Sequence, residues 1–136
     1  MVKENKEFVR NIVSKEMCRA ADFCGVRSGR DLDKFEATGL TREKASTVNV
    51  PLVKESPVNI ECKVTQVLEL GSHDMFLAKV TAVQVDESLL DEKGKLDLNK
   101  AHLVAYSHGE YQTFDNILGT FGYSVKKKDK KEKKKH

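Results

Sequence analysis

The chain has 136 residues, of which 39% are hydrophobic and 33% are charged, enough for one domain with a sizeable core. This balance excludes a wholly disordered chain, and no apolar run approaches the length of a membrane-spanning helix. The net charge of +3 is unevenly spread, because residues 126–136 hold eight lysines against two acids and leave −3 for the remainder.

Charge and cysteine usage give the expected organisation. Residues 1–125 are expected to form one domain and residues 126–136 a disordered lysine-rich tail. No aromatic residues interleave with the lysines to stack on bases, so no specific nucleic-acid partner is expected. The N-terminus lacks an apolar signal core, and Cys18, Cys24 and Cys62 are scattered without zinc spacing. We expect a cytoplasmic protein with reduced thiols, no metal and no membrane insertion.

The first half of the chain predicts a strand, a helix and a polar bend. Residues 8–13 alternate and are rich in β-branched side chains, which predicts a strand. Ser14 is a candidate N-cap for a helix over residues 15–24, and Gly25 is expected to end it in the left-handed conformation. Residues 31–37 predict a helical turn closed by Gly39, and residues 41–45 predict a second, weak helical turn.

A long antiparallel hairpin dominates the second half. Residues 57–70 and 75–86 predict two strands joined by a turn, and the slip in alternation at Gln66 predicts a bulge. Residues 87–90 predict a helical turn and residues 103–106 a short strand. The irregular segment 114–123 is expected to place Leu118 and Phe121 in the core. Several strands with few short helices predict a mainly β fold, an antiparallel barrel with helices outside.

The bend between residues 22 and 40, DFCGVRSGRDLDKFEATGL, is the strongest candidate site. Gly29 lies between Ser28 and Arg30, so backbone amides, a hydroxyl and a guanidinium could together bind a phosphate or another anion. Phe35, next to Lys34, could add an apolar wall. The alternative on residue types alone is a glycine-capped turn with solvated charges.

Candidate residues for chemistry outside the bend are few. The chain has no GxSxG, Walker, HExxH or paired-cysteine motif, so a reaction carried by a cofactor is favoured over side-chain nucleophilic catalysis. His73 occupies the hairpin turn, where the alternative is an ordinary turn histidine. His108 is flanked by Tyr106 and Tyr111, where the alternative is a turn with two packed aromatics.

Three segments together resemble the flavin reductase-like family. They are FCGVRSGRDLDKFEATGL, PVNIECKVTQVLELGSHDMFLAKV and AYSHGEYQTF, in this order and at compatible spacing. The resemblance runs from about residue 4 to residue 125. It implies an FMN-binding split barrel of Greek-key type, similar to flavoredoxins and incomplete at the N-terminus, where family members have further strands.

The resemblance also implies roles for individual residues. The GSH turn resembles the Gly-Asp-His turn of flavin reductases, which implies that His73 lies near the flavin and the nicotinamide, with Ser72 in place of the usual acid. The second histidine segment is implied to lie near the flavin pocket or a dimer interface. The implied cofactor-binding residues are Cys24, Ser28, Gly29, Arg30, Lys34, Phe35, His108 and Tyr111.

Two functions from different classes follow. The first is an FMN-binding oxidoreductase that takes electrons from NADH, NADPH or a redox partner protein and acts as a homodimer. The second is a non-catalytic, truncated split-barrel module that dimerises or complements another chain without binding flavin, because a barrel without its first strands has open sheet edges.

Overall fold

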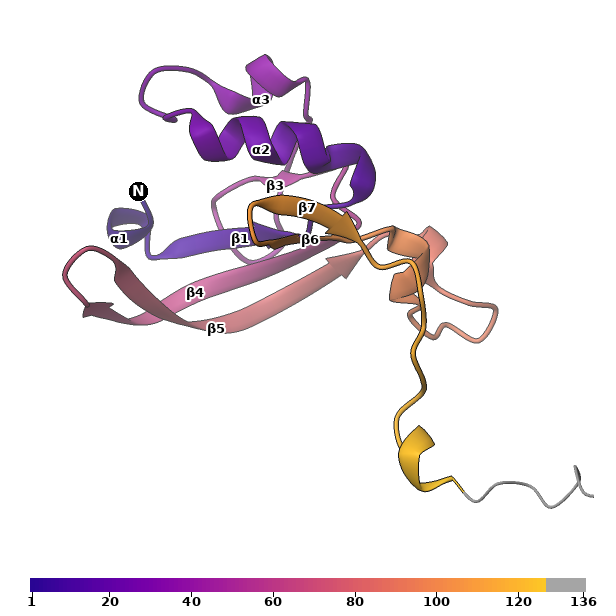
Figure 1. Ribbon diagram of the computed structural model, residues 1–136. Helices are drawn as coiled ribbons and strands as arrows, with labels where there is room; N and C mark the ends of the chain where they lie inside the picture. The colour runs from indigo at the N-terminus through magenta and orange to yellow at the C-terminus, as the bar shows by residue number, and fades with distance from the viewer. Residues whose placement is uncertain (127–136) are drawn as a thin grey trace, which may run out of the picture.

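The computed structural model describes residues 1–126, and the tail predicted from Lys126 onward lies outside them except for that first residue. Within this part the chain is mostly strand with a few short helices (Figure 1). The helices are α1 (Val2–Asn5), α2 (Cys18–Val26) and α3 (Lys34–Thr38), with 3-10 turns at Lys15–Met17, Glu87–Leu89, Leu98–Ala101 and Tyr123–Val125. The strands are β1 (Glu7–Asn11), β2 (Arg42–Glu43), β3 (Leu52–Val53), β4 (Val58–Glu69), β5 (Asp74–Val85), β6 (Val104–Ser107) and β7 (Glu110–Thr113).

The largest sheet has three antiparallel strands in the order β1, β4, β5. The β4–β5 hairpin forms because two long alternating runs flank a polar turn, as the sequence predicts. The short strands β2 and β3 pair with each other, as do β6 and β7, so the three sheets within residues 1–126 do not close into one barrel.

Two bulges shape the hairpin. The pairing shifts between Val64 and Gln66, next to the slip predicted from the sequence, and this leaves Thr65 as the extra residue of β4. A second shift leaves Thr81 as the extra residue of β5. Thr65 donates its hydroxyl to the Leu77 carbonyl at 3.1 Å, and Thr81 donates to the Glu61 carbonyl at 3.3 Å. Because a bulge increases the local twist, the hairpin is curved at both positions.

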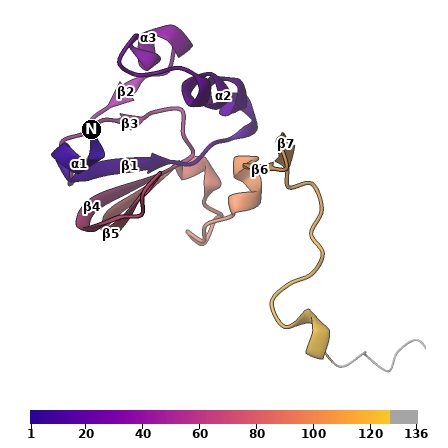
Figure 2. The same cartoon turned by 60° about the vertical axis from the view of Figure 1, so that its left-hand side comes forward.

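The helices and the β2–β3 segment lie on one side of the sheet (Figure 2). Two apolar clusters form the core. One lies under the β2–β3 segment and comprises Ala45, Val48 and Leu52 with Val9 and Val50 packed against it. The other lies where the hairpin strands meet the following turns and comprises Val58, Leu89 and Ala101 with Ile12, Ile60, Val85 and Leu103.

Three local expectations are wrong. The helix α2 continues through Gly25 to Val26, and Gly25 does not adopt a positive φ; the extended backbone of Arg27 ends the helix instead. Residues 41–45 do not form a helical turn, because Arg42 and Glu43 pair with β3 and backbone pairing across the loop overrides weak local helix propensity. Gly39, by contrast, closes α3 at φ 72° as predicted.

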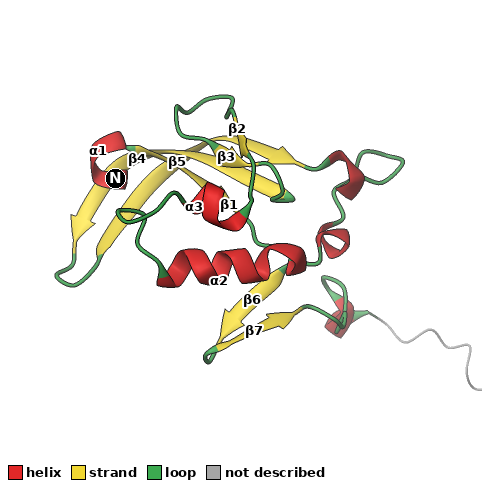
Figure 3. Cartoon of the chain, turned by 90° about the horizontal axis from the view of Figure 1, so that it is seen from above, coloured by secondary structure: helices red, strands yellow, loops and turns green. Residues whose placement is uncertain are grey.

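The third correction concerns the segment after β7. Leu118 and Phe121 were expected in the core, but their exposed fractions are 91% and 107%. Residues 114–125 leave the body of the molecule as an arm (Figure 1). Seen from above, the β6–β7 hairpin lies on the opposite side of α2 from the main sheet (Figure 3).

No helix within residues 1–126 combines the length and the apolar character that crossing a bilayer requires.

Candidate functional site

The bend between α2 and α3 is held by side chains that fold back on its own backbone. The Asp33 carboxylate caps α3 by accepting from the Phe35 and Glu36 amides at 2.9 and 3.4 Å. Arg42 donates to the same carboxylate at 2.6 Å, and its guanidinium carbon lies 4.6 Å from the centre of the Phe35 ring. The hydrogen bond from Arg42 lowers the pKa of Asp33. Arg42 therefore fixes both Asp33 and the Phe35 ring.

Lys34 ties the two helices together. Its Nζ donates to the Cys24 carbonyl at 2.5 Å, near the C-terminal end of α2, where a cation is favoured by the helix dipole. An ammonium group has three donors, so this bond leaves two for a ligand. A Cβ added at Gly29 would lie 3.7 Å from Lys34 Cε, which places Gly29 directly beside the lysine side chain.

The sequence predicts that the backbone amides of Ser28–Arg30 face a ligand. In the structure, some amides of this bend instead donate to other atoms of the bend. The Arg30 amide donates to Ser28 Oγ at 3.2 Å, and the Asp31 amide donates to the Ser28 carbonyl at 3.3 Å. The Arg30 guanidinium, however, has no hydrogen bond or ion pair with any other residue between 1 and 126. This guanidinium therefore remains available to an anion, together with the free donors of Lys34.

A hollow of about 650 Å³ lies against this bend. Its lining comes from the N-terminal residue, the bend, α3 and the β2–β3 segment: Met1, Gly29, Arg30, Asp31, Leu32, Asp33, Lys34, Phe35, Arg42 and Pro51. Three cations and two carboxylates line it, and one of these carboxylates is already paired with Arg42. The structure thus brings four predicted residues, Gly29, Arg30, Lys34 and Phe35, to one concave surface.

His73 lies elsewhere, at the exposed tip of the β4–β5 hairpin. Its Nδ1 is 2.9 Å from Ser72 Oγ, and its carbonyl accepts from the Leu70 amide at 3.0 Å. It is not among the residues that line the hollow. The two regions share α1 as a neighbour: Met1 lines the hollow, whereas Lys3 pairs with Glu69 at 2.8 Å and Asp74 at 2.9 Å beside the hairpin tip.

The second histidine segment forms the β6–β7 turn. His108 and Gly109 have φ values of 53° and 82°, which a two-residue hairpin turn requires. The Tyr106 and Tyr111 rings are tilted by 59° with centres 5.1 Å apart. Tyr111 donates its hydroxyl to Asp22 on α2 at 3.0 Å, and this bond raises the pKa of Tyr111. Tyr111 therefore contacts the same helix as Cys24 but does not line the hollow.

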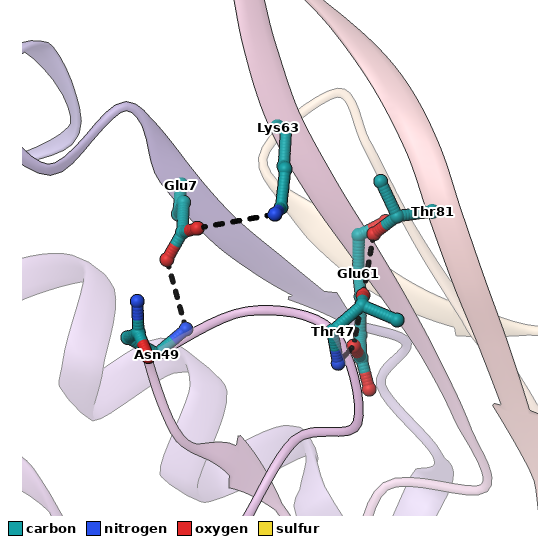
Figure 4. A network of polar contacts seen from close by, with 6 residues as sticks. All are labelled: Glu7, Thr47, Asn49, Glu61, Lys63 and Thr81. Carbon is teal, nitrogen blue, oxygen red and sulfur yellow. Dashed lines mark hydrogen bonds and ion pairs between the residues drawn. The ribbon is translucent and has the colours of Figure 1, made fainter.

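A buried carboxylate network, which no sequence pattern indicated, lies under the β2–β3 segment (Figure 4). Glu61 is fully buried, and it accepts from the Ser46 amide at 2.8 Å and from the Thr47 amide, the Thr47 hydroxyl and Gln84 Nε2 at 2.6 Å each. Burial by itself would raise the pKa of Glu61, but these hydrogen bonds outweigh it and lower the pKa to about 2.

A second carboxylate extends the network. Glu7 on β1 accepts from the Asn49 amide at 2.8 Å and lies 3.8 Å from Lys63 Nζ (Figure 4). The two glutamates hold residues 46–49 on the sheet. This segment leads to Pro51, which lines the hollow, and to β3, which pairs with the strand carrying Arg42. The network therefore positions one wall of the candidate site.

Known proteins are similar to this chain in sequence and fold. The model of the flavin reductase like domain matches residues 1–115. The chain belongs to this family. An uncharacterized protein of Pyrococcus abyssi is 34% identical over 118 residues, which cover 87% of this chain and 67% of that protein.

Solved structures agree with the family. Flavoredoxin of Desulfovibrio vulgaris is 33% identical, with a TM-score of 0.83 over 92% of this chain and 68% of that chain. An FMN-binding protein from Thermus thermophilus is 26% identical, with a TM-score of 0.65 over 82% of this chain and 60% of that chain. These likenesses confirm the predicted split-barrel fold. The chain spans about two thirds of the length of these proteins, and its family supports a flavin-dependent redox role.

Proposed function

We propose that the protein is an FMN-binding oxidoreductase that passes electrons from NADH, NADPH or a redox partner protein through bound flavin. The observation that carries the proposal is the Arg30 guanidinium, which pairs with no residue between 1 and 126, on a concave surface shared with Lys34 and Phe35 in a chain of the flavin reductase family. Two proteins with similar structures are a flavoredoxin and an FMN-binding protein, which supports the same proposal.

The residues around the hollow fit the chemistry of FMN. A volume of about 650 Å³ lies within the usual range for cofactor sites, roughly 300–1,000 Å³. The phosphate of FMN requires cationic donors, which Arg30 and Lys34 offer, and the flavin ring requires an apolar wall, which the Phe35 side chain offers. Arg42 holds the Phe35 ring in place through its guanidinium, so this wall is preformed.

FMN supplies the electron-transfer chemistry when bound, and the protein supplies binding and orientation. Arg30 binds the phosphate as a fork of N–H donors. Lys34, anchored by the Cys24 carbonyl, adds positive charge close to negative charge on the cofactor. Ser28 keeps the Arg30 backbone in its turn. Phe35 and Arg42 exclude water from one side of the ring.

The two histidine segments have different proposed roles: one contacts the nicotinamide, and the other lies over the bound flavin. His73 is the candidate for contact with the nicotinamide, and the neighbouring Ser72 hydroxyl orients its ring. His108 and Tyr111 are candidates for covering the flavin from the β6–β7 hairpin, which Tyr111 attaches to α2.

The test is a titration of the purified full chain with FMN, followed by flavin fluorescence and visible absorption. Arg30→Gln is expected to raise the Kd for FMN by roughly 10- to 100-fold, because a hydrogen bond to a charged group contributes about 1.5–3 kcal/mol. Arg27→Gln is the matched control, since Arg27 is exposed three residues away and does not line the hollow.

Two results would contradict the proposal. Equal losses in the Arg30 and Arg27 variants would mean that the anion is not bound at this surface. Protein that stays colourless with excess FMN would instead favour the non-catalytic split-barrel module, for which the open sheets of the described residues are the supporting observation.

A further inference from the structure

The bulge in β5 directs the Thr81 hydroxyl toward the segment that lies over the sheet, residues 46–53, here called the covering segment. Thr81 has no partner on β4, because the residues on either side of it pair with two consecutive residues of that strand. Its Oγ1 lies 2.5 Å from Thr47 Oγ1 in the covering segment (Figure 4). Bulges are common beside active sites, where they re-aim a side chain, so the partner of this hydroxyl indicates what the bulge does.

The two threonine hydroxyls and the Glu61 carboxylate form a chain of hydrogen bonds with one direction. An ionised carboxylate only accepts, so the Thr47 proton is donated to Glu61 Oε2 at 2.6 Å. Thr47 Oγ1 then accepts the Thr81 proton. That proton also has the Glu61 carbonyl within reach at 3.3 Å, but the contact with Thr47 is the closer of the two. Thr81 therefore holds Thr47 in the orientation in which it donates to the carboxylate.

The charge of Glu61 serves mainly to hold the covering segment. Glu61 forms no ion pair with any residue between 1 and 126. Three of the four donors to its carboxylate belong to Ser46 and Thr47, and the fourth is Gln84 Nε2. A buried charge without a cation depends on such donors, so the carboxylate and the first residues of the covering segment fix each other.

The covering segment connects this chain of hydrogen bonds to the hollow. Its far end is also tied to the sheet, because Asn11 Oδ1 on β1 accepts from the Val53 amide at 3.0 Å. Val53 pairs with Arg42 of β2. Arg42 in turn donates to Asp33 at 2.6 Å and lies 4.6 Å from the centre of the Phe35 ring. A displacement of the covering segment is therefore transmitted by backbone pairing to the apolar wall of the candidate site.

We propose that Thr81, Thr47 and Glu61 are positioning residues for the flavin site: the bulge hydroxyl sets the covering segment and thereby the place of Arg42 and Phe35 beside the cofactor. This inference rests on the proposed function. None of the three residues lines the hollow, so their effect on FMN is exerted through the wall and not by contact.

The first experiment titrates full-length variants with FMN. Thr81→Val keeps the shape of the side chain and removes the hydroxyl, and it is expected to raise the Kd for FMN by roughly 2- to 10-fold, the effect of one net hydrogen bond. At saturating FMN the visible absorption of the bound flavin is expected to shift, because the Phe35 wall has moved. Thr81→Ser, which restores the hydroxyl, is expected to restore both values.

Thr65→Val is the matched control. Thr65 is the extra residue of the other bulge, its hydroxyl donates to a strand carbonyl at 3.1 Å, and it does not line the hollow. Its loss is expected to leave the Kd and the flavin spectrum unchanged. Equal changes in the Thr65 and Thr81 variants, or no recovery in Thr81→Ser, would overturn the proposal.

The second experiment needs no flavin and separates this inference from the proposed function. Amide hydrogen exchange of the protein without FMN reports local opening of the backbone. In Thr81→Val, exchange is expected to become faster in peptides that cover residues 46–53 and also in those that cover residues 33–43, whereas Thr65→Val leaves both unchanged. A wild type that does not bind FMN would contradict the proposed function, and the exchange would still test the coupling. Faster exchange confined to residues 46–53 would overturn the coupling even in a protein that binds FMN.

Thr47→Val tests the same chain of hydrogen bonds from its other end and covers the case in which Thr81→Val fails to fold. It removes the bond to Glu61 as well as the acceptor of the Thr81 proton, so it is expected to raise the Kd for FMN at least as much as Thr81→Val. The double variant is expected to lose no more than Thr47→Val alone, because the two hydroxyls act through one contact. Additive losses, or a Thr47→Val protein with the wild-type Kd, would overturn the proposal.

Discussion

Residues 46–49, which lie over the main sheet, and the arm of residues 114–125 both lack regular strands or α-helices. The first segment is held against the sheet, whereas the arm is exposed. Residues 46–49 are fixed on the sheet by hydrogen bonds to Glu61 and Glu7, and the apolar residues around them, Ala45, Val48 and Leu52, are buried. The large apolar side chains of residues 114–125 are mostly exposed.

This difference shows that an irregular segment can be held as firmly as a strand when the rest of the chain supplies hydrogen-bond partners for its backbone. Carboxylates on two strands order the first segment, because the backbone N–H groups of Ser46, Thr47 and Asn49 each donate to a carboxylate oxygen. The arm has apolar side chains but no such partner within residues 1–126. Its apolar side chains therefore lack the burial that the first segment obtains from its own sheet.

The largest expected effect comes from breaking the ordered segment. Glu61→Gln should reduce the free energy of unfolding by about 3 kcal/mol, because the amide of Gln directs a donor at groups that are themselves donors. Urea unfolding followed by circular dichroism measures this change. Glu55→Gln is the control: Glu55 accepts from the Thr41 amide at 2.9 and 3.0 Å but is exposed, so its loss should be below about 1 kcal/mol. Equal losses would remove the special role of Glu61.

Acid should release the same segment. The pKa of Glu61 is about 2 in the folded protein against 4.5 ordinarily, so the folded state binds this proton more weakly than the unfolded state. The stabilisation is therefore complete above about pH 5 and is lost as the pH falls from about 4.5 to 2, by an amount on the order of 3 kcal/mol. The midpoint of urea unfolding measured across this window should fall steeply in the wild type and less steeply in Glu61→Gln. Parallel curves would contradict the assignment.

The smallest expected effect lies in the arm. Phe121→Ser should change the free energy of unfolding by less than about 0.5 kcal/mol, because Phe121 is fully exposed. The urea titration should be done on dilute protein. A loss of more than 1 kcal/mol there would show that the arm packs on its own chain, and the contrast between the two segments would disappear.

Local patterns predicted the parts of the fold that depend on neighbouring residues. The β4–β5 hairpin, its bulge near Gln66 and the closure of α3 at Gly39 follow from alternation and turn residues. The pairing of Arg42 with Val53 could not be predicted, because it joins residues across a loop and replaces the helical turn that local propensity favours. Leu118 and Phe121 were assigned to the core from their hydrophobicity alone, and hydrophobicity does not say whether the chain packs a side chain or leaves it exposed.

In the candidate site, too, the residues that are neighbours in sequence were predicted and those that meet through tertiary contacts were missed. The bend residues Gly29, Arg30, Lys34 and Phe35 are close in sequence, and their composition indicated a shared surface. Arg42 was missed because its contact with Asp33 and Phe35 depends on the β2–β3 pairing. Glu61 was missed because alternation groups it with Lys63 and Thr65, and no pattern shows that residues 46–49 cover that face. The placement of His73 with the bend stays a prediction.

The position of α1 has a practical consequence for handling the protein. Met1 borders the hollow beside Arg30, while Lys3 is tied to the hairpin tip by Glu69 and Asp74. A purification tag fused ahead of Met1 would therefore emerge at the mouth of the hollow, where an acidic extension could compete with phosphate for the guanidinium. Recombinant protein intended for ligand measurements should carry its tag at the other terminus or have it removed.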